Sequence, residues 1–259
     1  MAGETLKQSA ILGPFVQAGQ CLLFLFRMLA GLRPRGEQIL AILQQTYLIG
    51  ARSLVIIMIC GFFVGMVLSL QAINALEQFG ASDQVSLLVG KSLFRELGPV
   101  LTALLFAGRA GTSVTAEIGL MKATDQLSAM EMMAVDPMKY VATPRFLGGV
   151  IAMPFLAAIF SMVGLLGTHL VAVELLSVDV GAFWQQMREQ VDVYDDVLAG
   201  ILKSFVFGVA ASLLAVFEGY NSIPTAEGVS RATTRTVVLT ALSVLVLNFM
   251  LTAVLIGEV

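Results

Sequence analysis

Apolar and polar positions alternate on a long scale, so that the chain divides into apolar runs joined by shorter polar segments. Three runs contain no charged residue: 53–76, 146–173 and 236–257. As a helix, each is long enough to cross a hydrocarbon core of about 30 Å. Two further runs, 84–108 and 197–217, are nearly as apolar but are interrupted by charged residues. The pattern predicts five transmembrane helices.

The composition supports a membrane protein. Hydrophobic residues make up 58% and charged residues 13% of the chain, and the mean hydropathy is +0.89. These values lie outside the range of soluble domains and predict an all-α integral membrane protein. No internal repeat or low-complexity linker divides the chain, so we interpret residues 1–259 as a single membrane domain.

The positive charges are distributed unevenly between the two sides of the predicted bundle. Most of the 15 Lys and Arg residues precede the first span or lie in 109–145 and 218–235. On the other side, 77–83 has none, and the acidic segment 174–196 has only Arg188. Because positively charged flanks stay on the cytoplasmic side, the N-terminus is predicted to be cytoplasmic and the C-terminus external. The net charge of −3 reflects the acidic segment and gives no indication of nucleic-acid binding.

The N-terminal stretch 8–26 is apolar enough to enter a membrane, but it contains three glutamines, two glycines and Pro14. An interfacial helix fits this mixture better than a sixth span does. We therefore predict an interfacial helix region at 8–35, ahead of the five spans.

Motifs for covalent chemistry are weak. Cys21 and Cys60 form no disulfide framework or metal-ligand spacing, and His169 has no second ligand near it. The triplet 90–92 resembles the end of a phosphate-binding loop, but Val85 stands where the first Gly should be. No nucleophile, base and orienting acid occur together. We expect a non-catalytic subunit that binds no metal or cofactor of its own.

The polar connector 109–137 separates the second and third spans. Its spacing predicts one amphipathic helix over about 114–136, ended by Pro137. Such a short segment cannot bury a core of its own, so its apolar face must be covered by a membrane surface or by another protein. The predicted face consists of Leu120, Ala123, Leu127, Met130 and Ala134.

Gly61 and Gly65 have the small-xxx-small spacing that allows two membrane helices to approach closely. The spacing leaves open whether the contact lies within the subunit or across a dimer.

Charged residues inside the predicted spans are costly, at roughly 2.5–3.5 kcal/mol each, and need compensation. Arg95, Glu96 and Lys203 are such residues, and Pro99 predicts a local kink beside them. If Lys203 faces the same cavity with Asn248, the bundle contains a polar pocket that suits an amphiphile with an anionic headgroup. The alternative is a buried pair of Glu96, with Lys203 or Arg95, that only holds helices together.

Six sequence runs resemble a known family. They are 94–99 (FRELGP), 105–111 (LFAGRAG), 115–121 (TAEIGLM), 130–137 (MEMMAVDP), 223–225 (IPT) and 228–238 (GVSRATTRTVV). The chain resembles the MlaE permease family, the membrane subunit of the bacterial ABC transporter for maintenance of outer-membrane lipid asymmetry. The resemblance covers nearly the whole chain.

The resemblance implies a homodimeric permease in the inner membrane of a Gram-negative bacterium, with a periplasmic C-terminus and phospholipid in a cavity at the dimer centre. ATP and Mg would bind a separate ABC ATPase subunit, which carries a STAS-domain protein. A periplasmic MCE-domain hexamer would sit on the external face. The connector would be the coupling helix, through which ATPase motion collapses the lipid cavity.

The resemblance also implies roles for individual residues. The lipid pathway would include Arg95, Glu96, Lys203, Asn248, Leu68, Leu76 and Phe79. The ATPase coupling contacts would be Glu117, Leu120, Met121, Leu127 and Met130. Asn248 replaces an acidic residue found in a relative, which argues against a proton-linked or salt-bridge role at that position.

Two other functions remain open at this point. The intramembrane charges also occur in ion-coupled secondary transporters, although five spans without inverted repeats fit that class poorly. A structural membrane anchor for an external lipid-binding ring is the other alternative. Lipid headgroup preference and transport direction are not indicated by the sequence.

Overall fold

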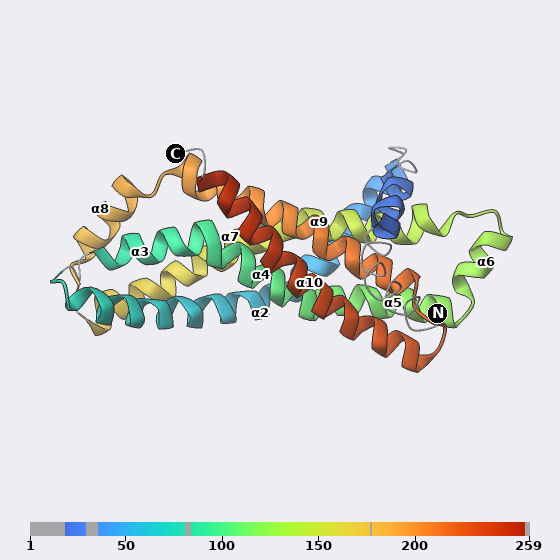
Figure 1. The fold of residues 1–259 in the computed structure, drawn as a ribbon, viewed down its shortest axis with the longest axis horizontal. Helices are drawn as coiled ribbons and strands as arrows, with labels where there is room; N and C mark the ends of the chain where they lie inside the picture. Colours follow the sequence, from blue (N-terminus) through green and yellow to red (C-terminus); the bar gives the residue numbers. More distant parts are fainter. Residues whose placement is uncertain (1–18, 30–35, 81–83, 177, 257–259) are drawn as a thin grey trace, which may run out of the picture.

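The computed structural model describes residues 19–29, 36–80, 84–176 and 178–256, and within these residues every regular element is helical (Figure 1). The helices form an elongated bundle, with α3 and α8 at one end and α6 at the other. Five helices are long and apolar enough to cross a membrane: Gln38–Glu77, Val85–Ala123, Met138–Leu175, Tyr194–Tyr220 and Ala226–Val254. The prediction of five spans in an all-α membrane protein is confirmed. Most helices extend beyond the predicted apolar runs because their polar flanks continue the helix.

The first span is α2 (Gly36–Glu77), and it runs along the third span, α7 (Thr143–His169). Their backbones approach very closely at two glycines of α2. A Cβ atom at Gly61 would lie 2.8 Å from the carbonyl oxygen of Phe160, and one at Gly65 would collide with the carbonyl of Gly164. Gly61 and Gly65 therefore face α7 of the same chain, which decides the question that their spacing left open.

The second span is interrupted by two π-helical segments. Because Pro99 lies in the first turn of α4 and has no amide hydrogen to donate, the α-helical hydrogen-bond pattern is broken just before it. The local distortion predicted at this proline is present as η2. In chain order the span consists of α3 (Val85–Ser92), η2 (Leu93–Leu97), α4 (Gly98–Phe106), η3 (Ala107–Gly111) and α5 (Thr112–Ala123).

The connector after the second span is not one helix. α5 ends at Ala123, Asp125 adopts a left-handed backbone conformation with φ of 57°, and α6 spans Gln126–Met132. The prediction of a continuous helix over 114–136 is wrong, because Asp125 adopts the left-handed region, which Asp tolerates better than most residues. Pro137 does not end this helix.

Pro137 instead precedes the third span, which begins with η4 (Met138–Ala142). This span continues through α7 into η5 (Leu170–Leu175). The acidic segment after it contains α8 (Val180–Gln190) and η6 (Val193–Leu198), and η6 leads into the fourth span, α9 (Ala199–Tyr220). The fifth span, α10 (Ala226–Ile256), crosses the bundle obliquely (Figure 1).

A short apolar helix, Gly19–Leu29, precedes the spans, as predicted. Phe24 holds it to the bundle, with its ring centroid 5.6 Å from those of Phe217 and Tyr220. The opposite side of this helix is exposed and apolar, including Leu22, Leu23 and Phe26, which agrees with an interfacial position. The other parts of the predicted region, 8–18 and 30–35, lie outside the described residues.

Candidate functional site

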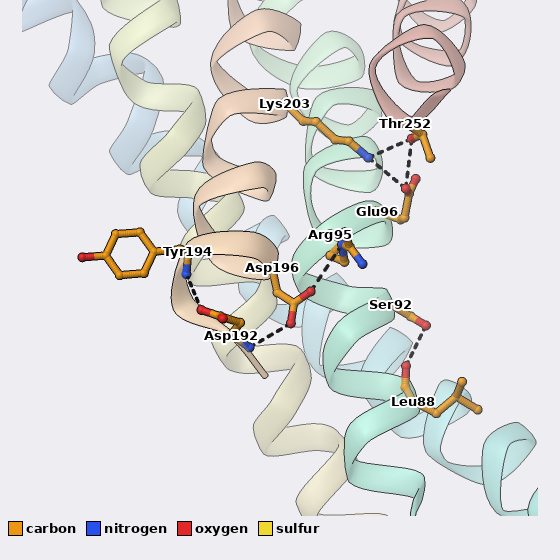
Figure 2. A network of polar contacts seen from close by, with 9 residues as sticks. All are labelled: Leu88, Ser92, Arg95, Glu96, Asp192, Tyr194, Asp196, Lys203 and Thr252. Carbon is orange, nitrogen blue, oxygen red and sulfur yellow. Dashed lines mark hydrogen bonds and ion pairs between the residues drawn. The ribbon is translucent and has the colours of Figure 1, made fainter. Parts of the chain in front are cut away.

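Glu96 lies at the centre of a polar cluster formed by three helical segments, η2, α9 and α10. Its Oε1 atom accepts hydrogen bonds from Lys203 Nζ at 2.8 Å and from Thr252 Oγ1 at 2.9 Å (Figure 2). Its Oε2 atom accepts from Asn248 Nδ2 at 3.0 Å. The second and fourth spans, which are far apart in the sequence, are thereby joined to the fifth by charge-assisted contacts.

Lys203 depends on this pairing more than Glu96 does. The Lys203 side chain is 3% exposed and the Glu96 side chain 36%, so Lys203 has almost no solvent to stabilise its charge. The Glu96–Lys203 pair considered from the sequence is present. The alternative pair of Glu96 with Arg95 is wrong, because consecutive helical residues are rotated by about 100°.

Arg95 pairs instead with Asp196 at the start of the fourth span. Arg95 Nε lies 3.3 Å from Asp196 Oδ1, and the Asp196 side chain is 3% exposed. The other oxygen, Oδ2, accepts a hydrogen bond from the backbone amide of Asp192 at 3.0 Å (Figure 2). The buried carboxylate therefore connects η6 to the second span.

Sequence reasoning missed Asp196 and Thr252, although a helical signal was available for both. Asp196 precedes Lys203 by seven residues, which is two helical turns, and Thr252 follows Asn248 by four, which is one turn. Asp196 was assigned to the external acidic segment because its charge lies next to Asp195 in the sequence, outside the apolar run.

A cavity of about 250 Å³ opens beside this cluster. It is smaller than the roughly 300–1,000 Å³ of pockets that enclose a whole small ligand, so it can hold a headgroup but not a complete phospholipid. Charged residues of the second and fourth spans therefore share one polar pocket, but Asn248 does not line it. Its lining residues are Lys91, Ser92, Arg95, Glu96, Ala199, Lys203 and Thr252.

Four residues assigned to the lipid pathway by resemblance do not line this cavity: Asn248, Leu68, Leu76 and Phe79. Leu68 and Leu76 lie on α2 and are partly buried against the core. Phe79 lies in the turn after α2 and is 82% exposed. A role for these residues in a lipid path stays a prediction.

The residues predicted to form one apolar coupling face point in different directions. Leu120 is 60% exposed, whereas Leu127 is only 6% exposed. Met121 and Met130 pack partly against the core. The break at Asp125 changes the direction of the chain, so the stripe expected for a single helix is not formed.

Two apolar side chains of the connector are more exposed than Leu120: Met132, at 83%, and Met133, at 68%. They lie where α6 ends, and sequence reasoning did not single them out because their spacing places them beside the predicted stripe.

Polar contacts fix the base of the connector to the bundle. Glu117 Oε2 lies 3.4 Å from Arg145 Nε, which joins α5 to α7. Lys122 Nζ donates to the carbonyl oxygen of Tyr220 at 2.8 Å, at the end of α9. The second span is therefore held to the third and fourth spans at the base of the connector.

Comparisons with known proteins agree with this architecture. The model of the family described as "Permease MlaE" matches residues 42–254. The chain belongs to the MlaE permease family. It is therefore a multi-pass membrane permease of an ABC transport system, which implies an ATPase partner.

Several curated relatives support this MlaE assignment. The "Intermembrane phospholipid transport system permease protein MlaE" of Haemophilus influenzae is 49% identical over 243 residues, which cover 94% of this chain and 93% of the relative. A "Probable ABC transporter permease protein" of Rickettsia typhi is 37% identical, covering 83% and 82% of the two chains. The chloroplastic protein TRIGALACTOSYLDIACYLGLYCEROL 1 of Arabidopsis thaliana is 27% identical, covering 82% of this chain and 60% of the relative.

No group of three or more His, Cys, Asp or Glu residues that could hold a metal ion occurs in the part of this MlaE permease that the structure describes. His169, the single histidine, packs between aromatic rings, with its centroid 5.3 Å from Phe183 and 5.4 Å from Trp184. Its surroundings indicate a packing role.

Proposed function

We propose that this MlaE permease moves phospholipid between the inner membrane of a Gram-negative bacterium and a periplasmic MCE-domain hexamer, and so maintains the lipid asymmetry of the outer membrane. The observation that carries the proposal is a charged cavity within the apolar bundle of an MlaE-family chain. The name of the Haemophilus relative, an intermembrane phospholipid transport permease, supports the same substrate.

The cavity suits the polar part of a phospholipid. Lys91 and Arg95 offer donors to a phosphodiester, while the Glu96–Lys203 pair keeps the wall of the cavity polar. The acyl chains would remain against apolar helix faces, since the cavity is too small for them. This arrangement allows a headgroup to enter the bundle without exposing the lipid tails to water.

The first and fifth spans leave most of their apolar surface uncovered. Only 28% of the most apolar stretch of the first span and 11% of that of the fifth are buried, against 56% for the second and third spans. We infer that a second copy of the chain and phospholipid tails cover these faces, so that the dimer encloses a lipid cavity lined by α2, the second span and α10. Leu68, Leu76 and Phe79 would line its outward part.

The connector end would receive the ATPase. Met132 and Met133 project from the end of α6, and contacts of α5 with α7 and α9 join this end to the bundle. ATP and Mg would bind the ATPase, which would also carry the STAS-domain protein. Closure of two ATPase subunits would rock the spans and collapse the cavity toward the MCE-domain ring.

The N-terminus would be cytoplasmic and the C-terminus periplasmic, as the charge distribution indicates.

Reconstitution tests the proposal. The chain, its ATPase and its MCE-domain partner are placed in liposomes, and transfer of labelled phospholipid to or from the MCE-domain protein is measured with ATP, without nucleotide and with a non-hydrolysable analogue. We expect transfer that depends on ATP hydrolysis. Solute flux driven by an ion gradient through the chain alone would support a secondary transporter instead. Transfer that is independent of ATP and of the α6 contact would support a membrane anchor.

A further inference from the structure

The charges that line the cavity do not balance. Three cationic side chains, Lys91, Arg95 and Lys203, line it together with one acid, Glu96. Lys203 is paired with Glu96 at 2.8 Å, and Arg95 is paired with Asp196 at 3.3 Å. Lys91 forms no ion pair or hydrogen bond with any residue that the structure describes. Among the described residues, the cavity therefore has one uncompensated positive charge, and Lys91 carries it.

Glu96 and Asp196, the two acids that contact the cations of the cavity, are each already paired with one of those cations. Both oxygens of Glu96 accept hydrogen bonds, from Lys203 and Thr252 on one side and from Asn248 on the other. Both oxygens of Asp196 are also occupied, by Arg95 and by the Asp192 amide. Among the residues that line the cavity, an entering ammonium group would meet no carboxylate that is not already paired with a cation.

One unpaired acceptor does lie beside Glu96, but it carries no charge. Asn248 Oδ1 is buried and has no hydrogen-bond partner among the described residues. It could accept a hydrogen bond from a hydroxyl group after a small movement, but it would not offset the charge of an ammonium group beside three cations.

We propose that the cavity prefers phospholipids whose headgroup is anionic, such as phosphatidylglycerol, over zwitterionic phosphatidylethanolamine, and that Lys91 determines this preference. The inference rests on the proposed function and adds the headgroup class. A phosphodiester with uncharged hydroxyls complements the free ammonium of Lys91, whereas the amine of phosphatidylethanolamine meets like charges.

The position of Lys91 is suited to this role. It lies in the last turn of α3 and one helical turn before Arg95, at the same cavity. A lysine near the end of a span could instead extend its amine to the membrane surface and have no contact with substrate. In that case its replacement would leave the composition of the bound lipid unchanged, which makes the two roles distinguishable.

The experiment compares the lipids that stay bound to the transporter complex with the lipids of the surrounding vesicles. The transporter complex is reconstituted in vesicles of equimolar phosphatidylglycerol and phosphatidylethanolamine and re-extracted, and the lipids that remain bound are quantified by mass spectrometry. We expect enrichment of phosphatidylglycerol in the wild type. Lys91→Leu should lower the bound ratio about fivefold, equivalent to about 1 kcal/mol, whereas Lys91→Arg should preserve it.

Lys139→Leu is the matched control. Lys139 does not line the cavity, and its Nζ atom pairs with Asp136 Oδ2 at a distance of 3.5 Å. Its replacement should leave the ratio unchanged. A wild-type ratio equal to that of the vesicles overturns the inference whether or not Lys91→Leu folds. An enriched ratio that Lys91→Leu does not lower also overturns it. In both cases ATP-dependent transfer would continue, so failure of the inference is distinct from failure of the proposed function, in which that transfer is absent.

Discussion

Glu96 and Lys203 are 107 positions apart in the sequence, and their side chains meet at 2.8 Å inside the bundle. Lys203 is almost completely buried while Glu96 is partly accessible from the cavity. The pair therefore stabilises the contact between the second and fourth spans and also forms part of the cavity wall, and these two roles can be separated by mutation.

Removal of one partner of the Glu96–Lys203 pair should destabilise the protein more than removal of both. Glu96→Gln leaves the Lys203 ammonium buried without a counterion, and we expect a loss of about 1–3 kcal/mol, less than for a fully buried pair because Glu96 is partly exposed. The double variant Glu96→Gln/Lys203→Met should recover part of that loss. Thermal unfolding of the purified complex in detergent measures both. A double variant less stable than Glu96→Gln alone would contradict the pairing.

The contact between α2 and α7 predicts a strong dependence on residue size. Gly65→Ala should lower stability by about 2 kcal/mol or more, because its methyl group would collide with the backbone carbonyl of Gly164, which cannot move independently of α7. Gly50→Ala is the control in the same helix, since its methyl group would meet only the Ala152 side chain at 3.9 Å. That change should be neutral or slightly stabilising. Equal melting temperatures for the two variants would contradict close packing at Gly65.

The exposed methionines predict where the ATPase binds. Met132→Asp combined with Met133→Asp should reduce co-purification of the ATPase at least tenfold while the bundle stays folded, because both side chains are exposed. Ser128→Asp places one negative charge at another exposed position of α6 and should have little effect. Undiminished binding by the double variant would exclude this surface. Leu127→Asp differs in kind, because Leu127 is buried, and it should destabilise α6 itself.

The thiol of Cys21 reports on docking of the N-terminal helix. Burial, followed by the nearby carboxylate of Glu218, raises the pKa of Cys21 from 9.0 to about 11. Since only the thiolate reacts, about one molecule in a thousand is reactive at pH 8, and alkylation should be slow. Phe24→Ala removes the aromatic contacts that hold this helix and should accelerate alkylation about tenfold.

This reaction is measured in a Cys60→Ser background, which leaves Cys21 as the single cysteine. The rate of iodoacetamide incorporation is followed from pH 7 to pH 10, and in the undocked variant the rise should shift to lower pH. Identical profiles with and without Phe24 would show that the helix does not protect Cys21.

Much of the site was predictable because it consists of charged residues, which are energetically costly inside a membrane span. Arg95, Glu96 and Lys203 stood out from the sequence since charges within apolar runs need partners. Which of these residues pair with one another was harder to predict from the sequence. A carboxylate next to Arg95 suggested one partner, whereas helix geometry turns Glu96 away from Arg95 and toward Lys203 and α10. Asp196 and Thr252 carried the required helical spacing but lay beside more conspicuous acidic and apolar neighbours.

The sequence by itself determined that the chain has five apolar helices, a polar connector and a helix distortion before Pro99. Hydrophobic patterning and the missing proline amide act over a few residues, so both can be read locally. The sequence also showed a family resemblance, which the comparisons confirmed. Only the tertiary structure decided that Gly65 packs on Gly164 and that Arg95 pairs with Asp196. It likewise decided that Leu127 faces inward while Met132 is exposed. These relations depend on the rotation of each helix and on the left-handed conformation of Asp125. Such rotations are set by packing between distant segments rather than by local sequence.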